Sequence, residues 1–277
     1  MSRRREVEER RRALSEIEGV LGAMKNLALL ETKKLARFLA TQHRVVESVD
    51  TALADLVAFH PQLLARAPAG EVHLLVGSER GFCADFNERI VTAASGEVPH
   101  GRPANCVVVG YKLSSRLGDD ARVAARIDGA TVAEEVDAVL TKAMDALVEL
   151  GGAAGSLRVN VIHNAPDQRE PRVRRLDPLS CALRSPRRAT APSLTLDPLP
   201  LFRELVHYYL DAHLHELFYQ SLAAENQRRL EHMEGAIDRV SREVAQLGLR
   251  RNVLRQEEIT EEIEVILLTA EMLRAPS

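Results

Sequence analysis

The chain has 277 residues, of which 45% are hydrophobic, 4% aromatic and 28% charged, and its formal net charge is -3. This charge gives no support for nucleic-acid binding, and three widely spaced cysteines exclude a disulfide framework and a cysteine zinc site. No apolar stretch approaches the roughly 20 residues that span a bilayer, so we expect membrane association only through partners.

The first segment, residues 1–60, has no proline, and its apolar residues recur every seven positions, as in a coiled coil. Its arginines alternate with glutamates near the start, which favours i, i+4 pairs on a solvated helix. We predict one long helix that ends before Pro61. The repeat consists of Val7, Leu14, Leu21, Ala28, Leu35, Val49 and Leu56, with companions Ile17, Met24, Phe38, Val45, Ala52 and Phe59.

The middle segment, residues 70–197, alternates apolar runs with amphipathic stretches, a pattern typical of a mainly parallel sheet covered by helices. The sequence therefore indicates a small Rossmann-like α/β domain. The predicted strands are 71–78, 104–112 and 156–164, and the predicted helices are 85–95 and 130–151. Arginines then form a basic patch, which is either a solvated edge loop or a docking surface for an acidic partner or anionic headgroups. They are Arg169, Arg172, Arg174, Arg175, Arg184, Arg187 and Arg188.

The last segment, residues 201–277, lacks proline before Pro276 and repeats its apolar residues every seven positions. Helices of this length bury little apolar surface alone, so we expect this one to pair with the first. The predicted fold class is α+α/β: a long antiparallel coiled coil of N- and C-terminal helices with an inserted α/β domain. The repeat consists of Leu205, Ala212, Tyr219, Met233, Val240, Leu247, Leu254 and Leu268.

Cys83 and Arg89 have the C-x5-R spacing of a phosphate-binding cysteine loop. Asp85 and Glu88 lie between them, where they would repel a phosphate and raise the pKa of the thiol. We therefore expect Cys83 to pack beneath a turn that Gly81 permits.

Motifs for cofactors and metals are missing from the sequence. The GSERG stretch lacks the G-x-G-x-x-G pattern of dinucleotide loops, and neither H-E-x-x-H nor a P-loop occurs. We expect no cofactor, no metal and no catalytic residue. Two alternatives stay open: an α/β enzyme with a cysteine site and helical oligomerisation arms, and a coiled-coil scaffold protein.

Four stretches along the chain follow recognisable patterns. LRRNVLRQEEITEEI follows L-x-Y-N-x-x-R-Q-x-x-I-T-x-E-I/L, and YQSLAAENQRRLEHMEGA follows Y-x-S-x-x-S-E-x-x-x-R-M-x-A-M-x-x-A. AMKNLALLETKKL follows A-M-K-M-V-A-x-x-K, and SERGFCADFN follows S-D-R-G-L-C-G-G-F-N. In this order they resemble the γ subunit of F-type rotary ATP synthases. The matching residues include Met24, Lys25, Ser78, Arg80, Gly81, Cys83, Tyr219, Ser221, Glu225, Arg229, Met233, Leu249, Asn252, Arg255, Gln256, Ile259, Thr260, Glu262 and Ile263.

The sequence also departs from the family patterns. Glu79 replaces an aspartate, Ala84 and Asp85 replace a glycine pair, and Arg251 replaces a tyrosine. These departures imply a divergent branch, such as the N-type ATPase that some bacteria carry as a second copy.

The resemblance implies a non-catalytic central rotor shaft that couples ion-driven rotation to ATP synthesis or hydrolysis. Its implied partners are an α3β3 ring of α and β subunits, the ε subunit and a membrane c-ring. It implies a peripheral location at the cytoplasmic face of the bacterial plasma membrane. The expected ring contacts are Arg255, Gln256, Met24, Lys25, Glu262, Val265, Leu268 and Leu273, and the expected foot residues are Arg172, Arg174, Arg175, Arg187 and Arg188.

Overall fold

The computed structural model describes residues 3–64, 70–98, 105–151, 157–166, 168–178 and 193–274. The chain divides into two compact units. One takes residues 28–230, and the other takes residues 1–27 with 231–277. These units cut across the three segments expected from the sequence, because both long helices run through both units.

Helix α1 covers Arg3–Phe59 and helix α6 covers Pro198–Arg274, so the prediction of long N- and C-terminal helices is confirmed. Pro198 and Pro200 lie in the first turn of α6, where a missing N–H costs no helical hydrogen bond. No helix in the described part of the chain is long and apolar enough to cross a membrane.

The chain between these two helices forms a five-stranded sheet with the strand order β3-β2-β1-β4-β5. The first four strands are parallel, and β5 pairs antiparallel with β4 at one edge. The sheet is therefore mixed but mainly parallel, as the Rossmann-like prediction requires. The strands are β1 Gly70–Val76, β2 Cys106–Val109, β3 Val123–Ile127, β4 Leu157–His163 and β5 Arg172–Leu176.

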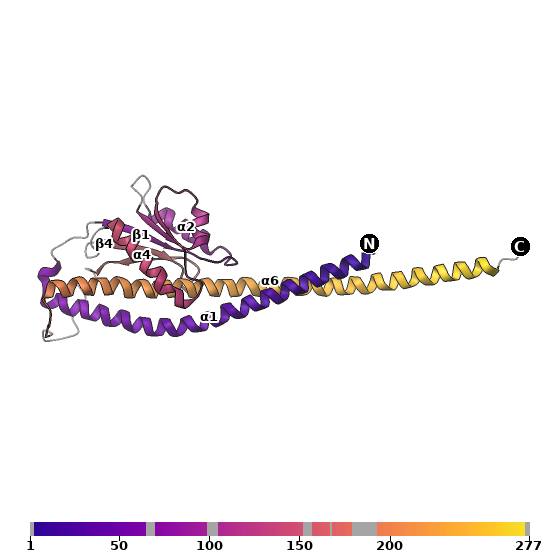
Figure 1. Cartoon of the computed structure of the whole chain (residues 1–277), viewed down its shortest axis with the longest axis horizontal. Helices are drawn as coiled ribbons and strands as arrows, with labels where there is room; N and C mark the ends of the chain where they lie inside the picture. Colours follow the sequence, from indigo (N-terminus) through magenta and orange to yellow (C-terminus); the bar gives the residue numbers. More distant parts are fainter. Residues whose placement is uncertain are drawn as a thin grey trace. The chain divides into compact units, whose positions relative to one another are not determined.

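Helices cover both faces of the sheet (Figure 1). On one face, α4 (Val136–Gly151), α1 and α6 share a large apolar core with the strands. On the other face, α2 (Phe86–Glu97) packs with α3 (Tyr111–Leu117) in a second, smaller core. Two short 3-10 turns, Pro61–Leu64 and Ala133–Glu135, follow α1 and precede α4.

The predicted strand 104–112 is too long. It ends at Val109, because Gly110 adopts a φ of 108° and Tyr111 begins α3. A Cβ on Gly110 would lie 2.8 Å from the carbonyl oxygen of Gly77, and one on Gly77 would lie 2.3 Å from Cβ of Leu113. The two glycines therefore allow the chain segments that follow β1 and β2 to pack closely against each other.

The seven-residue repeat of α1 is only partly buried. Leu35 and Leu56 are buried as expected, but the companions Ile17 and Val45 are 48% and 43% exposed. Leu53 is fully buried although it lies outside both predicted lines. The seven-residue repeat does not predict the burial of Leu53, because the second half of α1 packs against the α/β core as well as against α6.

Candidate functional site

The end of α6 carries a long exposed apolar surface. Every side chain from 259 to 270 is exposed. Contiguous exposed apolar side chains mark an interaction surface. The residues Ile259, Ile263, Val265, Ile266, Leu267 and Leu268 are between 46% and 66% exposed.

The structure places six of the eight predicted ring-contact residues on the last part of α6, between residues 255 and 273. Arg255, Gln256 and Glu262 are exposed, as are Val265 and Leu268. Leu273 lies in the helix, but its side chain falls outside the described residues.

Met24 and Lys25 lie elsewhere in the same unit. Both are half-buried, and Nζ of Lys25 lies 2.9 Å from the carboxylate of Glu234 on α6. Arg255 is 21 residues further along α6 than Glu234, which is roughly 30 Å at 1.5 Å per residue. The two predicted contacts are therefore at different levels of the helix pair.

Arg255 instead shares a pocket of about 710 Å³ with the start of α1. Arg4 pairs with Glu258 at 2.8 Å, and Arg251 lies 3.5 Å from Glu8. The sequence predicted that the N-terminal arginines pair with glutamates along α1. Among the described residues of this helix start, the pair of that kind is Arg11 with Glu8, at i, i+3. The full lining is Arg4, Arg5, Glu8, Arg251, Arg255 and Glu258.

This pocket could have been found from the antiparallel register of the two helices. Arg10 pairs with Glu243 at 2.5 Å, so residues near the start of α1 must face residues in the 240s and 250s. The pKa of Glu8 is lowered, first by the hydrogen bond from Arg11 and also by the charges of Arg11 and Arg251.

The basic patch is only partly described. Arg172, Arg174 and Arg175 are exposed on the edge strand β5, while Arg187 and Arg188 lie outside the described residues. Successive strand residues point to opposite faces, so Arg174 and Arg175 do not share a face. Of the described residues of the patch, Arg169 lies in a bend before β5, whereas the other three lie on the strand itself.

Cys83 is buried next to the ion pair of Glu225 and Arg229 on α6, and Arg229 donates a hydrogen bond to its sulfur. Burial first, and then the charge of Glu225, raise the pKa of the thiol to about 12. The acid beside the thiol is therefore Glu225, whereas Asp85 pairs with Arg89 at 2.6 Å. A buried, neutral thiol cannot act as the nucleophile of a cysteine enzyme.

Glu225 and Arg229 connect α6 to the loop after β1 through hydrogen bonds to the backbone of that loop. Burial raises the pKa of Glu225 to about 7, although Arg229 and the backbone N–H groups of Arg80 and Glu79 favour its charged form. Arg229 also donates to the carbonyl of Gly81 at 3.4 Å and to Oδ1 of Asn226 at 2.7 Å. The polar groups of this buried cluster are therefore matched to one another.

The expectation that Gly81 permits the turn is wrong. The left-handed residues of this loop are Phe82, with φ 64°, and Ala84, with φ 49°. A Cβ on Gly81 would have only one neighbour within 4 Å, the end of the Lys112 side chain at 3.8 Å. The strained position is therefore Ala84, which stands where the family pattern has the first glycine of its pair.

Parallel sheets commonly bind ligands at the carboxyl ends of their strands, but here protein groups fill this edge. The Glu79 carboxylate accepts hydrogen bonds from the backbone N–H groups of Tyr111, at 2.8 Å, and Gly129, at 2.6 Å. Ser221 of α6 donates to the carbonyl of Val76 at 3.4 Å. Within the described ranges, no group of three potential metal ligands occurs.

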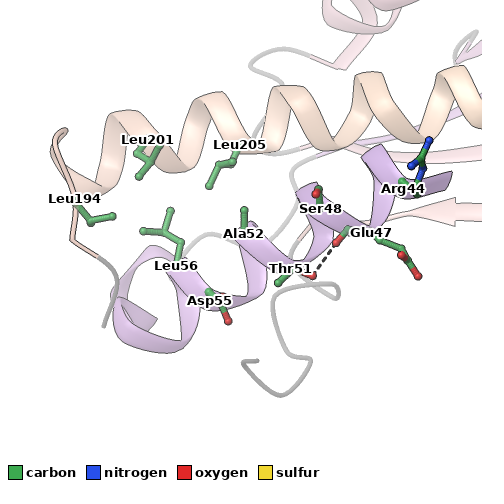
Figure 2. Close-up of a pocket in the computed structure, with 10 residues that line it drawn as sticks. All are labelled: Arg44, Glu47, Ser48, Thr51, Ala52, Asp55, Leu56, Leu194, Leu201 and Leu205. Atoms are coloured by element: carbon green, nitrogen blue, oxygen red, sulfur yellow. Dashed lines mark hydrogen bonds between the residues drawn. The ribbon is translucent and has the colours of Figure 1, made fainter. Parts of the chain in front are cut away.

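A groove of about 650 Å³ separates the end of α1 from the start of α6 (Figure 2). Leu201 and Leu205 of α6 and Leu56 of α1 form its apolar side, and Arg44 and Glu47 lie at its polar end. Its mixed lining gives no preference for a particular ligand.

Comparisons with known proteins agree over nearly the whole chain. A family model described as ATP synthase matches residues 3–273. The chain is 27% identical to the ATP synthase gamma chain of Saccharopolyspora erythraea over 80% of each chain. It is 23% identical to the ATP synthase gamma chain of Heliobacterium modesticaldum, over 95% of this chain and 96% of that one.

Solved structures share the fold. The chain matches one from the rotor of the Euglena gracilis mitochondrial ATP synthase with a TM-score of 0.61 and 12% identity, over 92% of this chain and 98% of that one. It matches a chain from the central stalk and c-ring of the Tetrahymena thermophila mitochondrial ATP synthase with a TM-score of 0.53 and 17% identity. That match covers 78% of this chain and 99% of the other.

Proposed function

This chain belongs to the ATP synthase γ-chain family, and we propose that it turns inside an α3β3 ring and is joined to a membrane c-ring. It is a non-catalytic subunit of the ATP synthase central stalk, the rotor of the F1 sector. Its coupling role follows from mechanics: a torque applied at one end of a stiff helix pair is delivered to the ring at the other.

The observation that carries this proposal is the exposed stretch 259–270, where α6 continues past its last pairing with α1. Arg4 pairs with Glu258, and every side chain from 259 onward to 270 is exposed. An apolar helix end of this kind requires a covering partner. In the proposed complex, Val265, Leu268 and Leu273 turn against the collar of the α and β subunits, and Glu262 lies at its rim.

Two levels of polar contact with the ring are proposed. Arg255 and Gln256 are exposed and free to reach loops of the β subunits. Met24 and Lys25 form the second level, roughly 30 Å away along the helix pair. Lys25 already pairs with Glu234, so a β-subunit carboxylate would have to compete with that pair.

Rotation would change nucleotide affinity through differential contact energy. Each β subunit meets a different side of the two helices in turn, and a contact made in only one state shifts the equilibrium toward that state. The shaft therefore needs no catalytic group of its own.

A second surface is the proposed foot. Arg172, Arg174 and Arg175 on the edge of the sheet, with Arg187 and Arg188 further along the chain, would face the ε subunit or the c-ring. The chain would then lie at the cytoplasmic face of a bacterial plasma membrane, held there by the c-ring. Its assignment to the N-type branch, and its division into segments 1–60, 70–197 and 201–277, stay predictions.

The ring contact is tested in a complex reconstituted with α, β, ε and c subunits. Replacing Arg255 and Gln256 together by alanine should lower ATP turnover and coupled ion transport. Arg250→Ala, an exposed change on the same helix, is the matched control and should keep both. Full coupled activity of the double variant would refute the assignment of these two residues.

A further inference from the structure

The pocket between the start of α1 and residues 251–258 of α6 holds more positive than negative charge. Its lining has four arginines and two glutamates, and they come from both helices of one unit. Because each glutamate carries one negative charge, the pocket keeps a net charge of about +2 at neutral pH.

The two glutamates are already engaged. The carboxylate of Glu258 lies 2.8 Å from the guanidinium of Arg4, and the carboxylate of Glu8 lies 3.5 Å from that of Arg251. In the described part of the chain, Arg5 and Arg255 have no ion-pair partner, and both are exposed. The pocket therefore presents one uncommitted guanidinium from each helix.

Guanidinium groups match phosphate oxygens with two parallel hydrogen bonds, and they keep their charge at any physiological pH. We propose that this pocket binds a small anion with two adjacent phosphate groups, held by Arg5 on α1 and Arg255 on α6. Inorganic pyrophosphate and the polyphosphate end of a nucleotide both have this chemistry. The proposal goes beyond the shaft function and does not depend on it, because the isolated chain contains the whole site.

This site differs from the loop around Cys83, where acids also lie near a possible phosphate. There Asp85 pairs with Arg89 and Glu88 pairs with Arg116, so the guanidinium groups closest to these two acids are already in ion pairs. In the pocket, both carboxylates are matched and two further arginines remain. Arg251, which pairs with Glu8, stands where the family pattern has a tyrosine, so part of the positive charge of this pocket is absent from that pattern.

Binding would have a structural consequence, because its two ligands lie on different helices. A bound diphosphate would join the first turns of α1 to α6 and slow the fraying of the end of α1. Since the site is open to solvent, its affinity should fall steeply as salt screens the charges.

Titration calorimetry of the full chain with pyrophosphate at low ionic strength tests the proposal. Pyrophosphate should bind, and Arg5→Gln and Arg255→Gln should each weaken binding roughly tenfold. Arg250→Gln removes the same charge outside the pocket and should change the affinity by no more than about twofold. Glu258→Gln should strengthen binding, because it removes a repelling charge and releases Arg4.

Three results would overturn the proposal: no pyrophosphate binding, an equal loss in Arg250→Gln, or tighter binding of AMP than of pyrophosphate. Similar affinities for pyrophosphate and ATP, with AMP much weaker, would assign the ligand to polyphosphate groups of either source. Circular dichroism of each variant checks that the exposed replacements leave the helices intact. Coupled activity of the reconstituted complex is a separate readout, so the failure of one proposal leaves the other standing.

Discussion

The two compact units of this chain are stabilised by different means. In the unit of residues 28–230, apolar side chains from both long helices, α4 and the sheet form one continuous core. In the unit of residues 1–27 and 231–277, Met233 is the only buried hydrophobic residue within the described ranges. There the helices are joined by half-buried side chains and by ion pairs such as Arg10 with Glu243. The unit of residues 28–230 therefore has a hydrophobic core of its own, whereas the described part of the other unit has almost none.

The largest contrast should come from ion pairs. Arg229→Met leaves Glu225 buried without its partner and should lower the free energy of unfolding by about 3–5 kcal/mol. Arg10→Met removes an exposed pair of the other unit and should cost at most about 1 kcal/mol. Urea denaturation followed by circular dichroism measures both. Equal losses would mean that the two units do not differ in this respect.

Truncation of leucines gives the next contrast. Leu214 is fully buried in the large core, so Leu214→Ala should cost about 2–5 kcal/mol. Leu254 is only half-buried on the other unit, and Leu254→Ala should cost about 1 kcal/mol. The same denaturation experiment applies, and a larger loss at Leu254 would show that its unit has a tighter core than its exposure indicates.

A smaller effect of opposite sign is expected at Ala84. Because its φ of 49° strains an alanine, Ala84→Gly should raise the free energy of unfolding by about 0.5–1 kcal/mol. The same replacement at Ala36, exposed in the middle of α1, should lower it by about 1 kcal/mol. Thermal unfolding of both variants measures the two shifts, and a destabilised Ala84→Gly protein would exclude strain at this position.

The smallest expected effect is a change of stability with pH. It concerns the unit of residues 28–230, which charged side chains also stabilise. The pKa of His43 is raised by its hydrogen bond to Glu216 and by the charges of Glu216 and Glu47. Burial lowers the pKa of His215, but its hydrogen bond to Asp211 and the charges of Asp211 and Asp137 outweigh this and raise it.

Both folded-state pKa values lie above the ordinary histidine pKa of about 6.5. The stabilisation is therefore complete below about pH 6.5 and is lost as the pH rises through the raised values. We expect the double variant His43→Gln with His215→Gln to melt a few degrees below the parent at about pH 6, and by less at about pH 9. His207→Gln, which removes an exposed imidazole from α6, is the matched control. A difference that grows toward alkaline pH would contradict the assignment.

The sequence predicted what depends on local patterns. Proline-free repeats gave both long helices, and the continuous apolar runs of the central strands gave β1 and β4. Edge strands were missed, because β3 alternates half-buried and exposed residues and β5 is rich in arginine, so neither has a buried-strand pattern. Helix α3 was not predicted, and its first residues, Tyr111 and Lys112, were read as the end of a strand, because nothing in the sequence shows that Gly110 adopts a positive φ.

At the candidate site, too, the sequence predicted what depends on a local motif and missed what depends on contacts between distant residues. The family resemblance singled out Arg255, because it lies in a contiguous motif that ends at Ile263, and the apolar residues after that motif were assigned to the ring by the same resemblance. The arginine pocket was missed, because it needs the register between helices more than 240 positions apart in sequence, as in Arg4 with Glu258. The role of Glu225 was likewise hidden, since its partner loop lies about 145 residues earlier, around Cys83.

The close approach of the chain after β1 and β2, at Gly77 and Gly110, limits which substitutions this sequence can accept. Gly110 would meet backbone atoms at 2.8 Å if it gained a Cβ, and backbone cannot yield as a flexible side chain can. Gly77 would meet the Cβ of Leu113, which is fixed by its own helix. Neither position can change by a single codon step to a larger residue without a simultaneous shift of its neighbour. Any related chain that keeps this close approach of the two segments should therefore carry both glycines together.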